Sequence, residues 1–541
     1  MGLFTLVEDR PTPKAVYNWR VYTCAAIASF ASCMIGYDSA FIGTTLALPS
    51  FVGEFGFAEM SKDHLALTKA NIVSVYQAGA FFGSIFAYAT SFYLGRKKSL
   101  WIFVTVFILG AGLMLGANTA RGLGLIIGGR VLAGIGVGGA SNMVPIYISE
   151  LAPPAVRGRL VGIYEAGWQI GGLVGFWINY GISEHLAPSH TQWLIPFAVQ
   201  LIPAGLLLFG SMWIRESPRW LLTKGRREEA LKNLCWIRNL PADDLYLIEE
   251  VAAIDAGLEY ERIHVGPGFW KPFAALRQKE VLWRFFLGGM LFLFQNGSGI
   301  NAINYYSPTV FKSIGVQGTN TGFLTTGIFG VVKTVLTFIW LLFLIDKLGR
   351  RKLLMIGATG GSLCMWFIGA YIKLSNPAAN TTNTKLSSGG IAAIFFFYLW
   401  TAFYTPSWNG VPWVINSEMF SQNTRSLGQA SAAANNWFWN FIISRFTPQM
   451  FIKMDYGVYF FFASLMIFSV VFVYFFIPET KSIPLEAMNR LFEIKPVSKA
   501  NKQVILELQE SEEDFRHDAE GAGLSVEKTK DSRIENVVAD V

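Results

Sequence analysis

The sequence LGRKK (residues 94–98) stands between two long apolar runs, and LGRRK (residues 348–352) stands between two more. A short basic loop between two apolar segments of about 20 residues each is typical of a hairpin of membrane-spanning helices. The motif recurs after 254 residues. The chain is therefore predicted to be an all-α polytopic membrane protein that consists of two related halves.

The composition supports this class. The 541 residues are 52% hydrophobic and 15% charged, whereas soluble domains carry about 25% charged residues. The mean hydropathy is +0.39. The net charge of +7 is not gathered in a patch that would bind nucleic acid. The four cysteines are scattered through the chain, which excludes a disulfide framework and a zinc-binding pattern.

Twelve apolar runs are long enough to cross a bilayer. They lie at about 21–47, 70–93, 99–118, 121–148, 159–182, 193–214, 282–306, 321–345, 352–373, 389–414, 425–448 and 456–477. The predicted domains are a cytoplasmic N-terminus (1–20), an N-terminal six-helix bundle (21–214), a cytoplasmic linker with short helices (215–281), a C-terminal six-helix bundle (282–477) and a cytoplasmic tail (478–541). We expect the acidic stretch of this tail, after about residue 500, to be disordered.

The orientation follows from the basic residues. Lysine and arginine are concentrated in the loops after even-numbered spans, and such residues stay on the cytoplasmic side. Both termini are therefore predicted to be cytoplasmic. Asn380 begins a glycosylation sequon in a loop that this topology places outside the cell. The N-terminus lacks the pattern of a cleaved signal peptide, and we expect the protein in the plasma membrane.

Other loop motifs also repeat in the two halves. Glu150 and Arg157 have the same seven-residue spacing as Glu418 and Arg425. The repeated motifs contribute Gly95, Arg96, Glu150, Arg157, Glu216 and Arg219 in the first half and Asp346, Gly349, Arg350, Glu418, Arg425 and Glu479 in the second. We interpret them as cytoplasmic ion-pair latches that hold the two bundles together when the protein faces outward. Parallel halves of this kind place a binding site at their interface, near the bilayer midplane.

These motifs resemble those of the sugar porter family of the major facilitator superfamily. The resemblance covers about residues 21–495 and is carried by GYD (36–38), GRVLAGIGVG (129–138), PIYISELAPPAVRG (145–158), ESPRW (216–220), DKLGRR (346–351), PWVINSE (412–418) and PETK (478–481). Within the family the chain is most similar to the fungal quinate permeases, most clearly over residues 16–51. The resemblance implies the major facilitator fold with 12 transmembrane helices, and proton-coupled transport by alternating access.

Charged side chains inside predicted spans cost at least a few kcal/mol and mark ion or substrate paths. By resemblance, Asp38 and Arg130 match the family's proton-coupling pair, although a static ion pair that stiffens the bundle is the alternative. Glu165 stands where the family has a sugar-contacting glutamine, and Lys333 stands near a family asparagine. Glu165 and Lys333 thus place an acid and a base where porters of neutral sugars have uncharged side chains, which indicates a substrate with its own charge. The alternative is that Lys333 snorkels to an interface or has a structural partner.

The segment FQNGSGINAINYY (residues 294–306) contains several amide side chains. Gln295 and Asn301 do not share one face of an ideal helix, but Gly297 and Gly299 allow local unwinding that turns both toward a cavity. Carboxamides donate and accept hydrogen bonds, as a ring of alcohols requires. By resemblance, the family's substrate contacts are matched by Gln295, Asn296, Asn301, Trp413 and Asn436. For any single amide, interhelical hydrogen bonding is the alternative.

The leading hypothesis is proton-driven uptake of a hydroxylated monocarboxylate, quinate foremost. The alternatives are a symporter for a neutral hexose or for an acidic sugar such as galacturonate, and a nutrient sensor that does not transport. The sequence contains no nucleotide-binding loop, nucleophile elbow or metal-ligand cluster. We therefore expect a protein that is not an enzyme and needs no cofactor or metal. Its expected partners are a small-molecule substrate, protons and the lipid bilayer.

Overall fold

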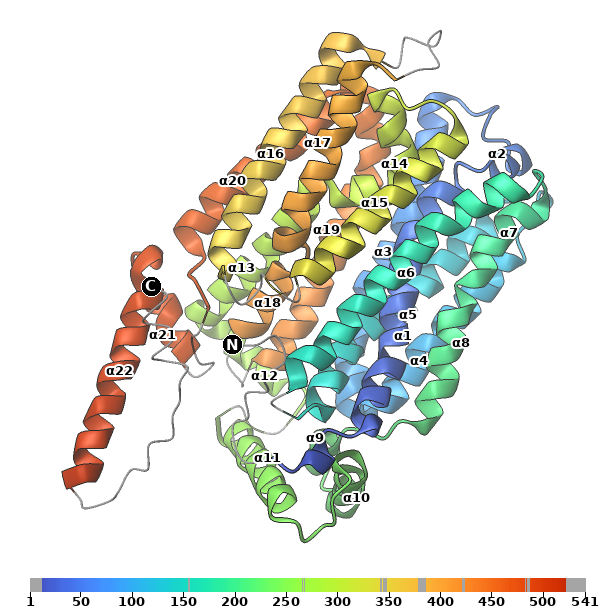
Figure 1. Ribbon diagram of the computed structural model, residues 1–541. Coiled ribbons are helices and arrows are strands. Elements are labelled where there is room, and N and C mark those ends of the chain that lie inside the picture. The colour runs from blue at the N-terminus through green and yellow to red at the C-terminus, as the bar shows by residue number, and fades with distance from the viewer. Residues whose placement is uncertain are drawn as a thin grey trace.

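The computed structural model describes residues 12–153, 156–264, 266, 268–340, 343, 348–377, 386–420, 424–481, 483 and 487–521. Within these residues all regular structure is helical, and the long helices form two bundles that lie side by side (Figure 1). Apart from α2 (Pro49–Glu54), the short helices gather at the end of the bundles where the two basic motifs lie, which we call the motif end.

The N-terminal bundle has six spans in the described part of the chain. They are α1 (Trp19–Thr45), α3 (Lys62–Leu94), α4 (Arg96–Leu115), α5 (Gly124–Leu151), α6 (Arg157–His185) and the consecutive helices α7 (His190–Val199) and α8 (Leu201–Trp213). A short helix, α2 (Pro49–Glu54), follows α1. Small residues let these helices approach closely, as is usual in membranes.

The C-terminal bundle repeats this order in the described residues, but two of its spans are interrupted. Its helices are α13 (Lys279–Gln295) with α14 (Asn301–Ile314), α15 (Thr319–Ile339), α16 (Arg350–Ser375), α17 (Ser388–Tyr404) with α18 (Val411–Glu418), α19 (Arg425–Met454) and α20 (Gly457–Phe476). A π-helical turn separates α13 from α14 at Asn296–Ile300, where Gly299 has a φ of +92°. A second one separates α17 from α18 at Thr405–Asn409. The unwinding predicted from the glycines of the first segment is therefore confirmed.

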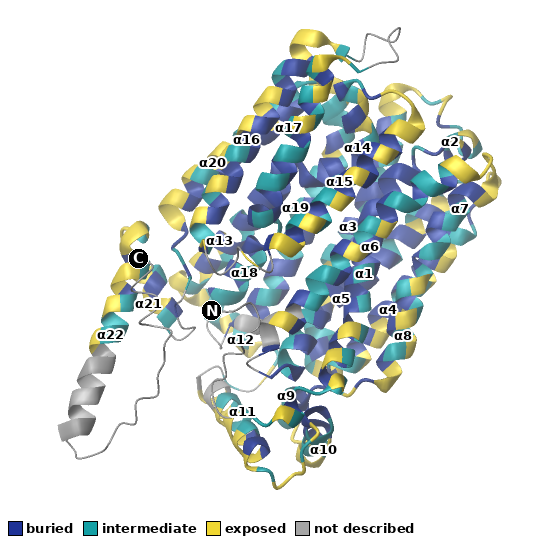
Figure 2. Cartoon of the chain, viewed as in Figure 1, coloured by how far each residue is buried: buried dark blue, intermediate teal, exposed yellow. Residues whose placement is uncertain are grey.

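The outer surface of the bundles is apolar. Figure 2 shows exposed residues along the outward faces and at the ends, with buried residues between the helices. Large exposed side chains such as Phe209, Leu363 and Phe468 suit contact with lipid.

Nine helical segments among the described residues are long and apolar enough to span a membrane by length and composition alone. The predicted spans that fall short of this criterion are α6, α13–α14 and α19, which carry predicted site residues in both halves.

The motif end carries the linker and the end segments. The linker contains α9 (Pro218–Thr223), α10 (Arg227–Arg238), α11 (Leu245–His264), α12 (Lys271–Ala274) and a 3₁₀ turn at Ala275–Arg277. A separate 3₁₀ turn at Lys14–Val16 lies before α1. Asn18 ties the start of α1 to α10 by donating to the carbonyl of Ile237 at 2.8 Å. After α20 come α21 (Met488–Glu493) and α22 (Val497–Gly521).

The expectation of disorder after about residue 500 is wrong as far as Gly521, because α22 is helical to that residue. Its Ala500 and Val504 are buried in one apolar cluster with Met488 and Leu491 of α21, and this contact favours the helix. The remaining acidic residues lie outside the described part of the chain.

Candidate functional site

A narrow cavity of about 20 Å³ lies between the two halves. Side chains and backbone from α1, α6, α14 and α15 line it, including Ser39, Gln169, Phe176, Asn304, Gly330 and Lys333. This volume holds a single water rather than a six-membered ring. The site is therefore contracted in this conformation and must widen when a larger molecule enters.

Lys333 supplies a positive charge to this cavity from the middle of α15. Its side chain is 8% exposed. Glu165 is the one carboxylate whose charge acts on it among the described residues, but none of these residues places a carboxylate within 4.0 Å of its ammonium. A buried ammonium without an ion-pair partner is costly in a membrane span. This arrangement favours a site for an anionic group.

Glu165 connects the two halves by a different route. Its carboxylate accepts from Gln169 of its own helix at 2.9 Å and from Asn409 of the interrupted span α17–α18 at 3.3 Å. Gln295 in turn donates to the carbonyls of Trp408 and Asn409, both at 2.8 Å. The predicted Glu165 and Gln295 are thus joined through Asn409.

Two further predicted amides, Asn296 and Asn301, are paired with each other. Asn296 donates to the carbonyl of Phe292 at 2.8 Å, and its own carbonyl accepts from Asn301. Trp413 packs edge-on against Phe292, with 4.7 Å between ring centroids. Asn436 lies on α19 and is 8% exposed. Of the predicted substrate contacts, Lys333 lines the narrow cavity and the others surround the interrupted helices.

Asp38 and Arg130 meet inside the N-terminal bundle. They form an ion pair in which both side chains are fully buried. Arg130 also donates to the carbonyl of Ile72 at 3.0 Å, and its guanidinium lies 4.4 Å from the ring centroid of Tyr76. Oδ2 of Asp38 and Nη2 of Arg130 are buried and find no hydrogen-bond partner in the described part of the chain. The pair is therefore formed but incompletely satisfied.

Sequence reasoning missed three polar residues near the centre. Gln169 and Asn409 both bind the carboxylate of Glu165, and Asn304 lines the cavity beside Lys333. Asn304 lies inside the segment FQNGSGINAINYY, so its position within a membrane span was visible in the sequence. The direction in which its side chain points could not be predicted, because the break between α13 and α14 sets the rotation of α14.

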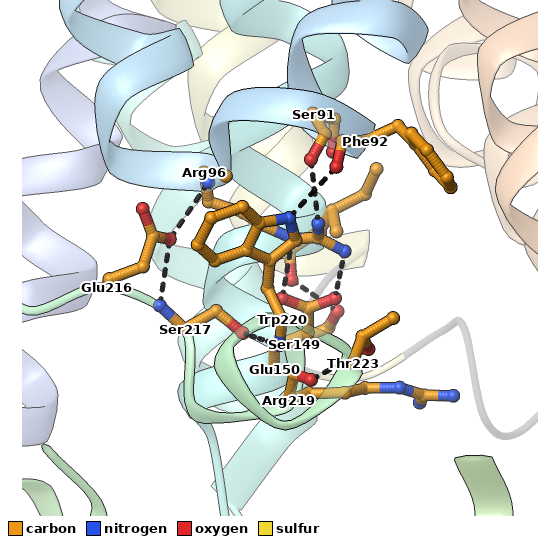
Figure 3. A network of polar contacts seen from close by, with 12 residues as sticks. Ser91, Phe92, Arg96, Ser149, Glu150, Glu216, Ser217, Arg219, Trp220 and Thr223 are labelled. Carbon is orange, nitrogen blue, oxygen red and sulfur yellow. Dashed lines mark hydrogen bonds and ion pairs between the residues drawn. The ribbon is translucent and has the colours of Figure 1, made fainter. Parts of the chain in front are cut away.

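The predicted loop motif of the N-terminal half is a connected network (Figure 3). Arg96 binds Glu150 with two hydrogen bonds, of 2.8 and 2.6 Å. Glu216 accepts from the backbone N–H of Arg96 at 2.9 Å and so caps the start of α4. Gly95 has a φ of +90°, and a Cβ there would lie 2.6 Å from a Glu216 oxygen. Arg219 extends away from the Arg96–Glu150 pair.

Two opposing effects act on the pKa of the Glu216 carboxyl. Burial raises the pKa of its carboxyl, whereas the N–H groups of Ser217, Arg96 and Lys97 lower that pKa. Burial is the larger effect, so the carboxylate form depends on these backbone donors.

The C-terminal half repeats the arrangement. Glu479 accepts from the backbone N–H of Arg350 at 2.8 Å, and the side chain of Arg350 reaches Glu418 at 3.1 Å. Gly349 has a φ of +78°, and a Cβ there would again lie 2.6 Å from the capping carboxylate.

All these latch contacts join elements within one half. In this conformation the described contacts do not connect the two bundles as the latch interpretation expected, because each glutamate lies beside the helix start of its own bundle. Asp346 and Asn380, and the side chains of Arg157 and Arg425, lie outside the described residues.

Comparison with known proteins identifies this architecture. A model of the "Sugar (and other) transporter" family matches residues 24–492. The chain belongs to the sugar transporter family. The predicted family and fold class are therefore confirmed: the protein is a multi-pass membrane transporter with the major facilitator fold.

Individual members of the sugar transporter family are similar over nearly the whole chain. The quinate permease of Neurospora terricola is 74% identical over 540 residues, which cover 99% of this chain and all of that protein. The MFS-type transporter qa-x of Neurospora crassa is 76% identical over 94% of this chain and 95% of its own length. Among solved structures, the proton:xylose symporter XylE of E. coli bound to 6-bromo-6-deoxy-D-glucose has a TM-score of 0.71 and 28% identity, covering 87% of this chain and 99% of XylE.

Proposed function

We propose that this transporter takes up a hydroxylated monocarboxylate, quinate foremost, together with protons and by alternating access. The observation that carries the proposal is the Lys333 ammonium, which lines the cavity between the halves with no carboxylate within 4.0 Å among the described residues. A neutral sugar offers only hydroxyl acceptors to this ammonium, whereas a carboxylate also neutralises its charge. The names of the Neurospora terricola permease and of the proton:xylose symporter agree with such a substrate and such a driving ion.

Lys333 receives the carboxylate of the substrate in this mechanism. The compact charge of lysine suits a single carboxylate without demanding bidentate geometry. Glu165, whose charge acts on Lys333 across the cavity, then competes with the substrate. The entering carboxylate frees Glu165 to accept hydroxyl hydrogen bonds or a proton, and so alters its link to Asn409 in the other half.

The amides bind the ring hydroxyls. Gln295, Asn296 and Asn301 now hydrogen-bond to each other or to backbone, so the substrate must replace those contacts as the site widens. Carboxamides re-pair readily with alcohols because each offers a donor and an acceptor. Trp413 supplies an apolar face for the ring, and Asn436 supplies a further amide from α19.

Asp38 carries the proton. Protonation removes its charge and releases Arg130, and loss of the proton restores the buried pair. A fixed buried ion pair adds little net stability. The unpartnered Oδ2 of Asp38 is an acceptor to which a proton can be delivered.

The proposed topology puts the motif end and both termini in the cytoplasm and the protein in the plasma membrane. The domains keep the predicted limits: two bundles, at 21–214 and 282–477, a cytoplasmic linker at 215–281 and cytoplasmic end segments at 1–20 and 478–541. At the opposite end, Ser183 of α6 donates to Asn320 of α15 at 2.6 Å, so the halves touch there. The latch network around Arg96 and Arg350 keeps each bundle rigid while the bundles move. Asn380 is glycosylated on the outer side.

The test is uptake of labelled quinate by cells that lack their own carrier, with galacturonate and glucose as competitors at two external pH values. We expect quinate accumulation that rises at the lower pH and is not reduced by glucose. Strong competition by glucose would point to a hexose carrier. Quinate binding to the purified protein without any uptake would indicate a sensor.

A further inference from the structure

Asn304 has a buried side-chain oxygen without a hydrogen-bond partner in the described part of the chain, although the residue as a whole is partly exposed. It stands on α14 and lines the same narrow cavity as Lys333. Its Oδ1 is buried, and no donor in the described part of the chain reaches it. A buried carbonyl that accepts no hydrogen bond is unfavourable. Such a group in a native structure needs an explanation, and at the wall of a cavity a hydroxyl of a bound ligand supplies one.

The neighbouring Tyr305 fixes the direction of Asn304. The Tyr305 hydroxyl accepts from Asn440 of α19 at 3.5 Å and donates to Gln77 of α3 at 3.1 Å. The backbone of Tyr305 lies against Gly43 of α1, where a Cβ would come within 2.3 Å of the Tyr305 carbonyl oxygen. These contacts hold α14 just after its break, so Asn304 presents its amide to the cavity in a fixed rotation.

We propose that Asn304 binds the hydroxyl on the carbon that bears the substrate's carboxylate, so that the site selects α-hydroxycarboxylates. The inference rests on the proposed function, in which Lys333 holds that carboxylate. Because Lys333 and Asn304 line one cavity of about 20 Å³, both contact the same end of the substrate. The hydroxyl on the carboxyl-bearing carbon is the hydrogen-bonding group nearest to the carboxylate. An alcohol can donate to the free Oδ1 of Asn304 and accept from its Nδ2.

The experiment compares quinate with shikimate, which keeps the carboxylate and the other ring hydroxyls but lacks the hydroxyl on the carboxyl-bearing carbon. KM for uptake of each compound is measured in the wild-type protein and in Asn304→Leu. The wild type should prefer quinate. The variant should raise KM for quinate about tenfold, the loss expected for one hydrogen bond of about 1.5 kcal/mol, and leave KM for shikimate nearly unchanged.

Asn416→Leu is the matched control. Asn416 is a buried amide, but its Nδ2 donates within α18 to the carbonyl of Pro412 at 2.9 Å. This variant should keep the preference for quinate. An unchanged preference in Asn304→Leu, or an equal loss for both compounds at a normal surface level, would overturn the role of Asn304. Absence of quinate uptake by the wild type would instead overturn the proposed function.

Discussion

Replacing Lys333 by asparagine tests the charge that carries the functional proposal. The variant keeps a polar side chain in α15 but removes the ammonium from the cavity. Loss of a charge-assisted hydrogen bond of about 1.5–3 kcal/mol should weaken quinate binding roughly ten- to a hundredfold. Folding should not suffer, because the 8% exposed ammonium has no carboxylate within 4.0 Å among the described residues. A lysine at the centre of a span costs about 2.5–3.5 kcal/mol on insertion, so the variant should be at least as stable as the wild type.

The assay combines quinate affinity, thermal unfolding of purified protein and surface level in cells. Methyl quinate, which carries no charge, separates the effects: it should bind weakly to the wild type and no more weakly to the variant. Lys312→Asn is the control, since Lys312 is an exposed lysine on α14. Unchanged quinate affinity in Lys333→Asn would falsify the assignment of the carboxylate to Lys333. A fall in the unfolding temperature together with lost binding would refute the argument that the lysine is functional rather than structural.

Three further substitutions test other parts of the mechanism. Asp38→Asn removes a titratable group without changing its shape and should abolish uphill accumulation of quinate while sparing exchange across the membrane; pH-dependent accumulation by this variant would move proton coupling elsewhere. Glu165→Gln removes a negative charge that competes with the substrate and should tighten quinate binding about tenfold, since charges in such sites interact by about 1–2 kcal/mol; weaker binding would show that Glu165 does not compete with the substrate for Lys333 and acts mainly as an acceptor for its hydroxyls. Gly95→Ala forces a φ of +90° on alanine and brings Cβ within 2.6 Å of a carboxylate oxygen, so the strain should lower the free energy of unfolding by about 1–3 kcal/mol and lower the unfolding temperature with it. Gly112→Ala, with no atom within 4 Å of the new Cβ, should be neutral, and equal effects of the two would contradict the capping geometry.

The sequence predicted the spans well because hydrophobic length and loop charge depend on local composition. It also predicted the break in the seventh span, because Gly297 and Gly299 lie close together between polar residues. The break in the tenth span was missed: there Pro406 lies in a π-helical turn, Gly410 directly follows it, and carbonyls of the turn accept from Gln295. A proline and a glycine at that spacing are compatible with an unbroken membrane helix.

The loop motifs show a second limit of prediction from the sequence. Their repetition was visible in the sequence and marked the residues that interact. Their partners were not visible, because Glu150 at the end of α5 binds Arg96 at the start of α4, and no spacing within one motif indicates that pair. Contacts between separate helices depend on how a bundle is assembled, and spacing along the chain does not report it. The same holds for Asn409, whose bond to Glu165 crosses from one half to the other.

The two halves use corresponding helices for different purposes. The first and fourth spans of the N-terminal half, α1 and α5, are continuous and carry the buried Asp38–Arg130 pair. Their counterparts in the C-terminal half are α13–α14 and α17–α18, and both are interrupted by a π-helical turn. Continuous helices hold a charge pair in fixed register, whereas interrupted helices free backbone and amide groups for a ligand.

The second of these interruptions is also one of the places where the halves are joined. Gln295 binds the carbonyls of Trp408 and Asn409 in the turn between α17 and α18, and Asn409 binds Glu165 of the N-terminal half. A substrate that replaces the contacts of Gln295, or a carboxylate at Lys333 that draws Glu165 away, therefore changes the same bridge. In the proposed mechanism, substrate binding in the C-terminal half therefore changes the contacts of the N-terminal half, which contains Asp38. Such an energetic link between the two sites is what coupling between substrate and proton requires.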